Sequence, residues 1–290
     1  MKLKTILLPI DFSPASATAA QQAGILARHF QSEVTMLHVN DLAMQARTAD
    51  MEIGLSGWDV PLAEYEAACG TRLGAFGVSE LRDVLVRRLF CSGDPARVIL
   101  ARAEADKVDL ILMPTHGYGT FRRLLLGSVT AKVLHDANCP VWTGKHFEGA
   151  QAAQIDQIGH VLCAVNFSQH SSRVVRCAAD LAADFGAKLT LVHALTEAPP
   201  ELPDRYLMSW HDEARWGTDE RLHSLVRELC IPAATLIVDG DAPRALAEAI
   251  RINGAGLLVI GRSPEQGMFG RLSGRSYGII CHAPCPVVSI

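Results

Sequence analysis

Short apolar runs alternate along the chain with longer segments whose apolar residues recur at helical spacing. In the first half we interpret the apolar runs as strands, at 5–10, 33–39, 81–89, 110–113 and 140–143. The intervening helical segments lie at 15–29, 63–74, 95–105 and 128–136. Ser13 before Pro14 is a typical start of a helix. Short strands separated by helices of about 10–15 residues predict βαβ units, and therefore a parallel sheet covered on both faces.

The second half repeats landmarks of the first half in the same order. LLPIDFS at 7–13 returns as LCAVNFS at 162–168, and EVTMLHV at 33–39 returns as KLTLVHA at 188–194. Three further landmarks recur, at 93–94 and 240–241, at 110–114 and 257–261, and at 139–141 and 285–287. This pattern indicates a duplicated unit. We predict two domains, 1–145 and 158–290, with a polar linker at 144–157 between the copies.

Composition narrows the class of protein. The 290 residues carry a net charge of -4, and the absence of a basic excess argues against a nucleic-acid binder. No apolar stretch reaches the roughly 18 residues of a membrane span, and Met1–Pro9 lacks a signal-peptide cleavage site. We therefore expect a cytoplasmic protein that contacts neither membrane nor nucleic acid.

The eight cysteines contain no C-x-x-C pair, which favours reduced thiols. We interpret Cys281–Cys285 as a helix end running into a strand, and a soft-metal or redox site is the alternative. Two longer segments, 41–62 and 196–216, are either lids and contact surfaces or ordinary surface insertions.

The stretch from Met113 to Thr130, MPTHGYGTFRRLLLGSVT, is a candidate phosphate-binding turn. Gly117 allows close approach of the backbone, and Gly127 with Ser128 opens a helix whose first N–H groups suit an anion. Arg122 and Arg123 either reach phosphate oxygens or belong to a solvated loop.

Asp11 follows the first strand and strengthens this interpretation. In a doubly wound sheet of order 3-2-1-4-5, Asp11 and Met113 flank the switch point where ligands bind. A carboxylate there can accept hydrogen bonds from ribose hydroxyls, and Val39 could pack on a base. The alternative for Asp11 is a helix cap or turn residue.

These residues resemble the universal stress protein family in its tandem form. ATP-binding members carry Gly-x-x-Gly, then nine residues, then Gly and Ser or Thr. Here Pro114-Thr115-His116-Gly117 is followed after nine residues by Gly127-Ser128-Val129-Thr130. The stretch Pro9-Ile10-Asp11 and Val39 also resemble the family's base and ribose pocket.

The resemblance implies two doubly wound five-stranded parallel-sheet domains of order 3-2-1-4-5, with an adenine-nucleotide α-hydrolase-like fold. It implies that the two copies pair through their last strands as a pseudo-two-fold unit within one chain, and a homodimer of chains is a further option. An adenosine pocket would be lined by Pro9, Asp11, Val39 and Met113. The phosphates would be surrounded by Gly117, Gly127, Ser128, Val129 and Thr130. Pro114 replaces the family's first glycine and has no N–H to donate, so either the ribose contacts are altered or the binding is weak.

The second copy departs further from the ATP-binding pattern. Asn166 stands in place of Asp11 and Ala164 in place of Pro9, and the loop begins Gly261-Arg262-Ser263-Pro264. We expect this half to have lost ordinary ATP binding, and to be a structural partner or to take a different ligand.

The sequence therefore favours a stress-response or regulatory protein that binds ATP in its first half and acts on an unidentified protein partner. Mg²⁺ is expected only with a bound triphosphate. The alternative is a protein-interaction scaffold of the same fold without nucleotide. A related adenylating enzyme would need a Ser-Gly-Gly-x-Asp-Ser or His-x-Gly-His motif, and neither is present. We predict no catalytic residue and, at most, slow ATP hydrolysis.

Overall fold

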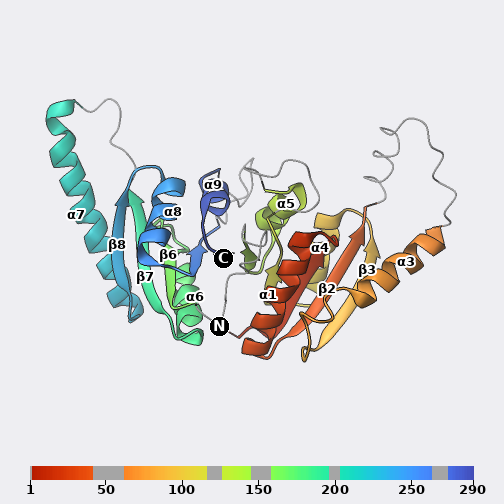
Figure 1. Ribbon diagram of the computed structural model, residues 1–290. Helices are drawn as coiled ribbons and strands as arrows, with labels where there is room; N and C mark the ends of the chain where they lie inside the picture. The colour runs from red at the N-terminus through yellow and green to blue at the C-terminus, as the bar shows by residue number, and fades with distance from the viewer. Residues whose placement is uncertain (1, 42–61, 116–125, 145–157, 196–202, 263–273) are drawn as a thin grey trace. The chain divides into compact units, whose positions relative to one another are not determined.

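The computed structural model describes residues 2–41, 62–115, 126–144, 158–195, 203–262 and 274–290 (Figure 1). The contacts divide the chain into two compact units, one containing Lys2–Val141 and the other Trp142–His146 with Ala153–Ile290. The division falls within a strand of the first repeat, and each half is described below by itself. In the described ranges, none of the helices combines the length and the apolar character that a membrane span requires.

The first half alternates strands with helices, as the hydrophobic pattern predicts. Its elements are β1 (Thr5–Ile10), α1 (Pro14–Phe30), β2 (Glu33–Asn40), α3 (Leu62–Ala75), β3 (Val86–Ser92), α4 (Pro95–Ala105), β4 (Leu110–Leu112), α5 (Ser128–Asp136) and β5 (Val141–Thr143). The strand order is β3-β2-β1-β4-β5. The β1 strand pairs in parallel with β2 and β4, so it lies at the centre of this half.

The second half repeats this architecture. Its elements are β6 (His160–Ala164), α6 (Ser171–Asp184), β7 (Lys188–Leu195), α7 (Asp204–Leu229), β8 (Ala234–Asp239), α8 (Ala242–Asn253), β9 (Leu257–Ile260), α9 (Gly274–His282) and β10 (Val287–Ser289). The order β8-β7-β6-β9-β10 matches that of the first half strand for strand. The predicted α/β class with doubly wound parallel sheets of order 3-2-1-4-5 is therefore confirmed.

The central strands are buried because helices cover both faces of a parallel sheet. Leu7 and Leu8 of β1 and Leu162 of β6 have no exposed surface. The side chain of Ser13 caps α1 by accepting a hydrogen bond from the backbone N–H of Ser16 at 3.1 Å, and Pro14 takes the first helical position. The predicted start of this helix is confirmed.

Two predicted segments differ from the structure. The third strand was expected at 81–89, with an irregular beginning as one option. It runs from Val86 to Ser92, because the chain before it forms turns in which Gly77 has φ +66°. Leu81 is buried within those turns, and this buried apolar residue is the reason that the strand was expected to begin there. The segment 196–216 was expected to be a lid or contact surface, or else an ordinary surface insertion. Residues 204–216 form the first half of α7, so they are regular helix and not a connecting loop, and 196–202 lie outside the described residues.

The interpretation of Cys281–Cys285 as a helix end is confirmed, since α9 ends at His282 and β10 begins at Val287. Burial raises the pKa of the Cys285 thiol to about 12, which keeps it protonated at neutral pH. All eight cysteines are free, and the described residues contain no cluster of potential metal ligands.

Candidate functional site

The two halves differ at the point where the central strands part. In the first half β1 pairs with β4 over Ile6 and Leu7 only, and Pro9 lies two residues further on. Proline has no N–H and cannot extend a ladder of backbone hydrogen bonds. In the second half Ala164 takes the place of Pro9, and the β6–β9 pairing continues to Ala164 opposite Ile260. The switch point of the sheet is thus less tightly paired in the first half.

Asp11 follows β1 at this switch point and organises the turn into α1. Its Oδ1 accepts hydrogen bonds from the Ser13 backbone N–H at 2.9 Å and from the Ser16 hydroxyl at 2.6 Å. Phe12, between them, has a left-handed φ of 64°. Asp11 is therefore a turn residue, as one of its two predicted interpretations stated. Its second oxygen, Oδ2, accepts no hydrogen bond from any side chain or N–H group in the described part of the chain.

The second half builds the same turn without a charge. Oδ1 of Asn166 accepts hydrogen bonds from the Ser168 backbone N–H at 3.1 Å and from the Ser171 hydroxyl at 3.2 Å. Phe167 has φ 55°, close to that of Phe12. The turn therefore requires one acceptor atom, which an amide supplies as well as a carboxylate does. The charge and second oxygen of Asp11 exceed what the fold needs.

Helix α5 begins without a side-chain cap. Gly127 occupies the N-cap position, and its own N–H donates to the Thr115 carbonyl at 2.7 Å. The first hydrogen bond inside the helix joins the Ala131 N–H to the Gly127 carbonyl at 2.8 Å. The N–H groups of Ser128 and the two residues after it precede that bond, so they belong to the donors that a helix leaves without an internal partner. Ser128 is exposed, so this end of the helix is open to solvent.

Thr130 and Pro114 form a link between α5 and the end of β4. The Thr130 hydroxyl donates to the Pro114 carbonyl at 3.0 Å, and Thr130 is 4% exposed. Its side chain therefore fixes the position of the helix start instead of facing solvent. Met113, one residue earlier, is buried as well.

The predicted site residues on the described segments gather at one edge of the sheet. Pro9 and Asp11 end β1 and follow it, and Val39 lies near the end of the adjoining β2, where Ile10 is in register with His38. Met113 follows β4, the neighbour of β1 on its other side. Because the carboxyl ends of parallel strands share an edge, these residues lie at the same edge of the sheet as the start of α5, where ligands of doubly wound folds bind. Gly117, together with His116, Arg122 and Arg123, lies outside the described residues.

Sequence reasoning missed an aromatic cluster beside this edge. The Phe12 ring lies 4.3 Å from the His38 ring, and the Arg72 guanidinium stands 4.4 Å above the Phe12 ring. Nδ1 of His38 is 2.9 Å from the Ile10 carbonyl oxygen. Burial is the largest influence on His38 and lowers its pKa, which favours a neutral ring. The cluster holds the left-handed Phe12 in place beside Asp11.

The second half contains the same cluster. Phe167 lies 4.8 Å from His193 between ring centroids, and the Arg221 guanidinium stands 4.0 Å above Phe167. The repeat carried the signal for it, because phenylalanine and histidine recur at matching places in LLPIDFS and LCAVNFS and in EVTMLHV and KLTLVHA. A cluster retained in both halves is explained by the turn that both halves share, so we assign it no ligand.

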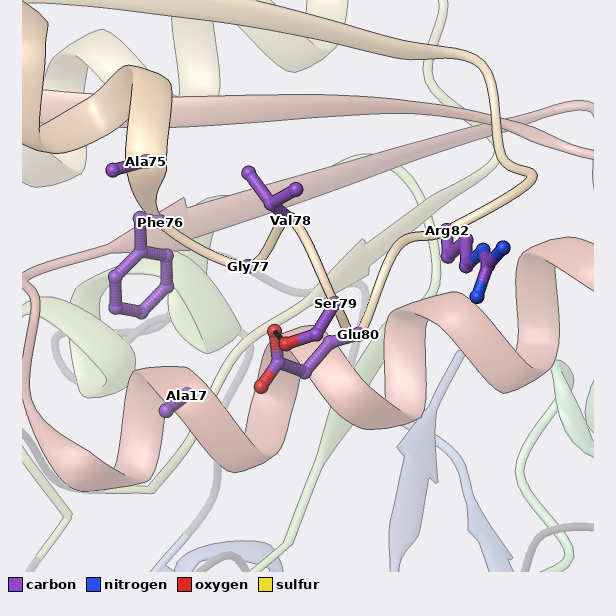
Figure 2. Close-up of a pocket in the computed structure, with 8 residues that line it drawn as sticks. All are labelled: Ala17, Ala75, Phe76, Gly77, Val78, Ser79, Glu80 and Arg82. Carbon is purple, nitrogen blue, oxygen red and sulfur yellow. Dashed lines mark hydrogen bonds between the residues drawn. The ribbon is translucent and has the colours of Figure 1, made fainter.

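A pocket of about 770 Å³ lies on the first half between α1 and the turn before β3. It is lined by Ala17, Ala75, Phe76, Gly77, Val78, Ser79, Glu80 and Arg82. Figure 2 shows Phe76 and Glu80 directed toward α1 and Val78 pointing away from it. Phe76 also meets the Phe12 ring edge-on at 5.5 Å. None of the predicted ligand residues lines this pocket, so it is separate from the predicted site at the strand ends.

The fold defines a tandem protein of the doubly wound α/β class. The model of the universal stress protein family matches the chain twice, over residues 2–144 and 157–290. The chain therefore belongs to the universal stress protein family, as its sequence motifs suggested.

Individual relatives agree with this assignment. Universal stress protein MJ0577 of Methanocaldococcus jannaschii is 31% identical over 150 residues, which are 48% of this chain and 92% of the relative. Universal stress protein Rv2005c of Mycobacterium tuberculosis is 28% identical over 181 residues, 62% of this chain and 60% of the relative. The crystal structure of a universal stress protein from Archaeoglobus fulgidus matches the fold with a TM-score of 0.73 and 22% identity. That match covers 100% of this chain and 98% of the solved one.

Proposed function

We propose that this universal stress protein binds ATP in its first half, at the crevice between β1 and β4, and acts as a regulator in the stress response. One observation carries the proposal. The turn after the central strand needs a single acceptor atom, as Asn166 demonstrates, yet the first half places a full carboxylate there. The spare oxygen of Asp11 lies at the switch point of the sheet, where ligands of doubly wound folds bind.

Each residue of the crevice has a role in this proposal. Pro9, Val39 and Met113 offer apolar surface to the adenine base, and Asp11 accepts hydrogen bonds from the ribose hydroxyls. The N–H groups of Ser128, Val129 and Thr130 donate to phosphate oxygens, aided by the positive end of the helix dipole. Gly117 completes the loop around the phosphates.

Pro114 contributes through its carbonyl group, because it has no N–H to offer. That carbonyl receives the Thr130 hydroxyl, which holds the start of α5 against the end of β4. Mg²⁺ would accompany the triphosphate and neutralise part of its charge. We assign no catalytic residue to the site. The eight free cysteines fit a reducing compartment, and we propose a cytoplasmic location.

The proposal predicts one ATP site per chain, because the second half lacks the carboxylate and the parted strands. Isothermal titration of the full chain with ATP and Mg²⁺ measures the stoichiometry directly, after any co-purified nucleotide has been removed. A stoichiometry near one is the expected result, with affinity falling in the series ATP, ADP, AMP as phosphates are lost. No binding at all would leave the chain a scaffold without nucleotide, and two equal sites would refute the asymmetry between the halves.

A further inference from the structure

Helix α7 carries an exposed tryptophan that the fold does not use. Its 26 residues span about 39 Å at 1.5 Å each, so it extends past the end of the six-residue β8 beside it (Figure 1). His211 and Arg215 contact the Asp239 carboxylate of β8, each at 3.0 Å, and fasten the helix to the sheet. Leu222 is fully buried on that side, whereas Trp216 is 74% exposed. The tryptophan therefore faces outward from a fixed helix.

Four exposed carboxylates surround this tryptophan. Asp212 and Glu213 precede Trp216 by four and three residues, and Asp219 and Glu220 follow it by three and four. Residues three and four apart lie next to each other on a helix surface, so all four acids border the indole on the same face. We call Trp216 with these four acids the α7 patch.

Half of the charge in the α7 patch has no partner within the helix. Asp219 lies 3.3 Å from His223, which forms an ion pair with it when the ring is protonated, and Glu220 pairs with Arg227 at 2.8 Å. Asp212 and Glu213 form no ion pair with any residue that the structure describes. The N-terminal side of the patch therefore presents unneutralised carboxylates next to a bare aromatic face.

The first half provides an internal control for this surface. Helices α3 and α7 are equivalent, because Arg72 and Arg221 stand over the matching rings Phe12 and Phe167. In that register Trp216 corresponds to Ala67. The four acids correspond to Ala63, Glu64, Gly70 and Thr71, which retain a single carboxylate. The same fold is therefore built without a patch of this kind, so packing of the helix does not require it.

We propose that the α7 patch binds an arginine-rich or lysine-rich segment of a partner protein. A guanidinium or ammonium group placed over the indole face gains a cation–π interaction, and tryptophan is the best ring for it. The carboxylates one turn before and after the ring then pair with neighbouring basic side chains. A second copy of this chain is a poor occupant, because two such patches would oppose carboxylates with carboxylates. The proposal does not depend on nucleotide binding in the first half.

The test uses the full chain and a fluorescein-labelled octa-arginine peptide, followed by fluorescence anisotropy. Trp216→Ala should weaken binding about tenfold, whereas Trp216→Tyr keeps an aromatic face and should lose less. Asp212→Asn with Glu213→Gln should weaken binding severalfold and reduce its salt dependence. The matched control is Glu66→Gln with Glu104→Gln, which removes equal charge from exposed positions on α3 and α4 and should leave binding unchanged.

Three outcomes would overturn the proposal. The first is that the wild-type chain shows no affinity for the peptide. The second is that the control pair weakens binding as much as the patch variants do, which would reduce the effect to overall charge. The third is that sedimentation shows self-association that Trp216→Ala abolishes, which would make the patch an interface between copies. Circular dichroism of every variant confirms that α7 remains helical.

Discussion

Replacing Asp11 with asparagine is expected to weaken ATP binding at least tenfold while leaving the free energy of unfolding nearly unchanged. The turn uses only Oδ1, and the second half makes the equivalent two hydrogen bonds with Asn166. The substitution replaces Oδ2 by an amide that donates instead of accepting. A hydrogen bond to a charged group contributes about 1.5–3 kcal/mol, which corresponds to roughly a 10-fold to 100-fold loss in affinity. Titration calorimetry and urea unfolding give the two quantities.

Two further variants make this test specific. Asp11→Ala removes the turn acceptor as well, so it should weaken binding and also destabilise the first half. Asn166→Asp places the carboxylate in the second half, where the β6–β9 pairing continues to Ala164. It should therefore leave the stoichiometry at one. If Asp11→Asn bound ATP with unchanged affinity, the Asp11 carboxylate would not be in contact with the nucleotide.

Replacing Gly127 with aspartate is expected to weaken ATP binding more than tenfold without destabilising the protein. Gly127 has φ -57° and ψ 146°, which any residue adopts, and no side chain caps the helix at this position. An aspartate there accepts hydrogen bonds from the N–H groups of the first turn and stabilises the helix by a few tenths of a kcal/mol over glycine. Its negative charge also repels a triphosphate that binds to the same N–H groups. Thermal unfolding and an ATP titration measure the two effects.

The chain offers a matched control for this substitution. Gly274 begins α9 in the second half, and a Cβ atom there would meet no atom of the described residues within 4 Å. Gly274→Asp should therefore be tolerated and leave ATP affinity unchanged. Gly127→Ser, which caps without a charge, should fall between the wild type and Gly127→Asp. If Gly127→Asp binds ATP as the wild type does, the phosphates do not lie at the start of α5.

The fold was predictable where local signals and the hydrophobic period agree. The bounds of β1, α4 and α5 were predicted to the residue, and a capping residue followed by proline marks the start of α4. There the Asp94 side chain accepts a hydrogen bond from the Arg97 N–H at 2.9 Å, ahead of Pro95. The start of β3 was predicted too early because Leu81 is buried in a turn, which hydrophobicity alone does not distinguish from a strand.

Helix α7 shows a different limit of sequence reasoning. Its first residues belong to a long stretch rich in proline and aromatic residues, so they were interpreted as a lid, a contact surface or a surface insertion. The helix packs against β8 through contacts between residues that lie far apart in sequence, such as the ion pair between Arg215 and Asp239. Pairings of this kind depend on the assembled sheet and leave no local pattern.

The sequence predicted which segments meet at this edge of the sheet better than it predicted how they contact one another. The ends of β1 and β4 and the start of α5 follow from the motif and from the rule for switch points. The bond from Thr130 to Pro114 was not predictable, because it joins segments that only the fold brings together. The effect of Pro9 on the β1–β4 pairing likewise emerged only from comparison with Ala164 in the second half.

Photolabelling with 8-azido-ATP, followed by peptide mapping of the full chain, tests most directly whether the nucleotide site belongs to the first half. The account predicts label on peptides from 2–144, competed by unlabelled ATP and strongly reduced by Asp11→Asn. The account would be contradicted by label on peptides from 157–290 that unlabelled ATP competes away, or by label that unlabelled ATP does not displace.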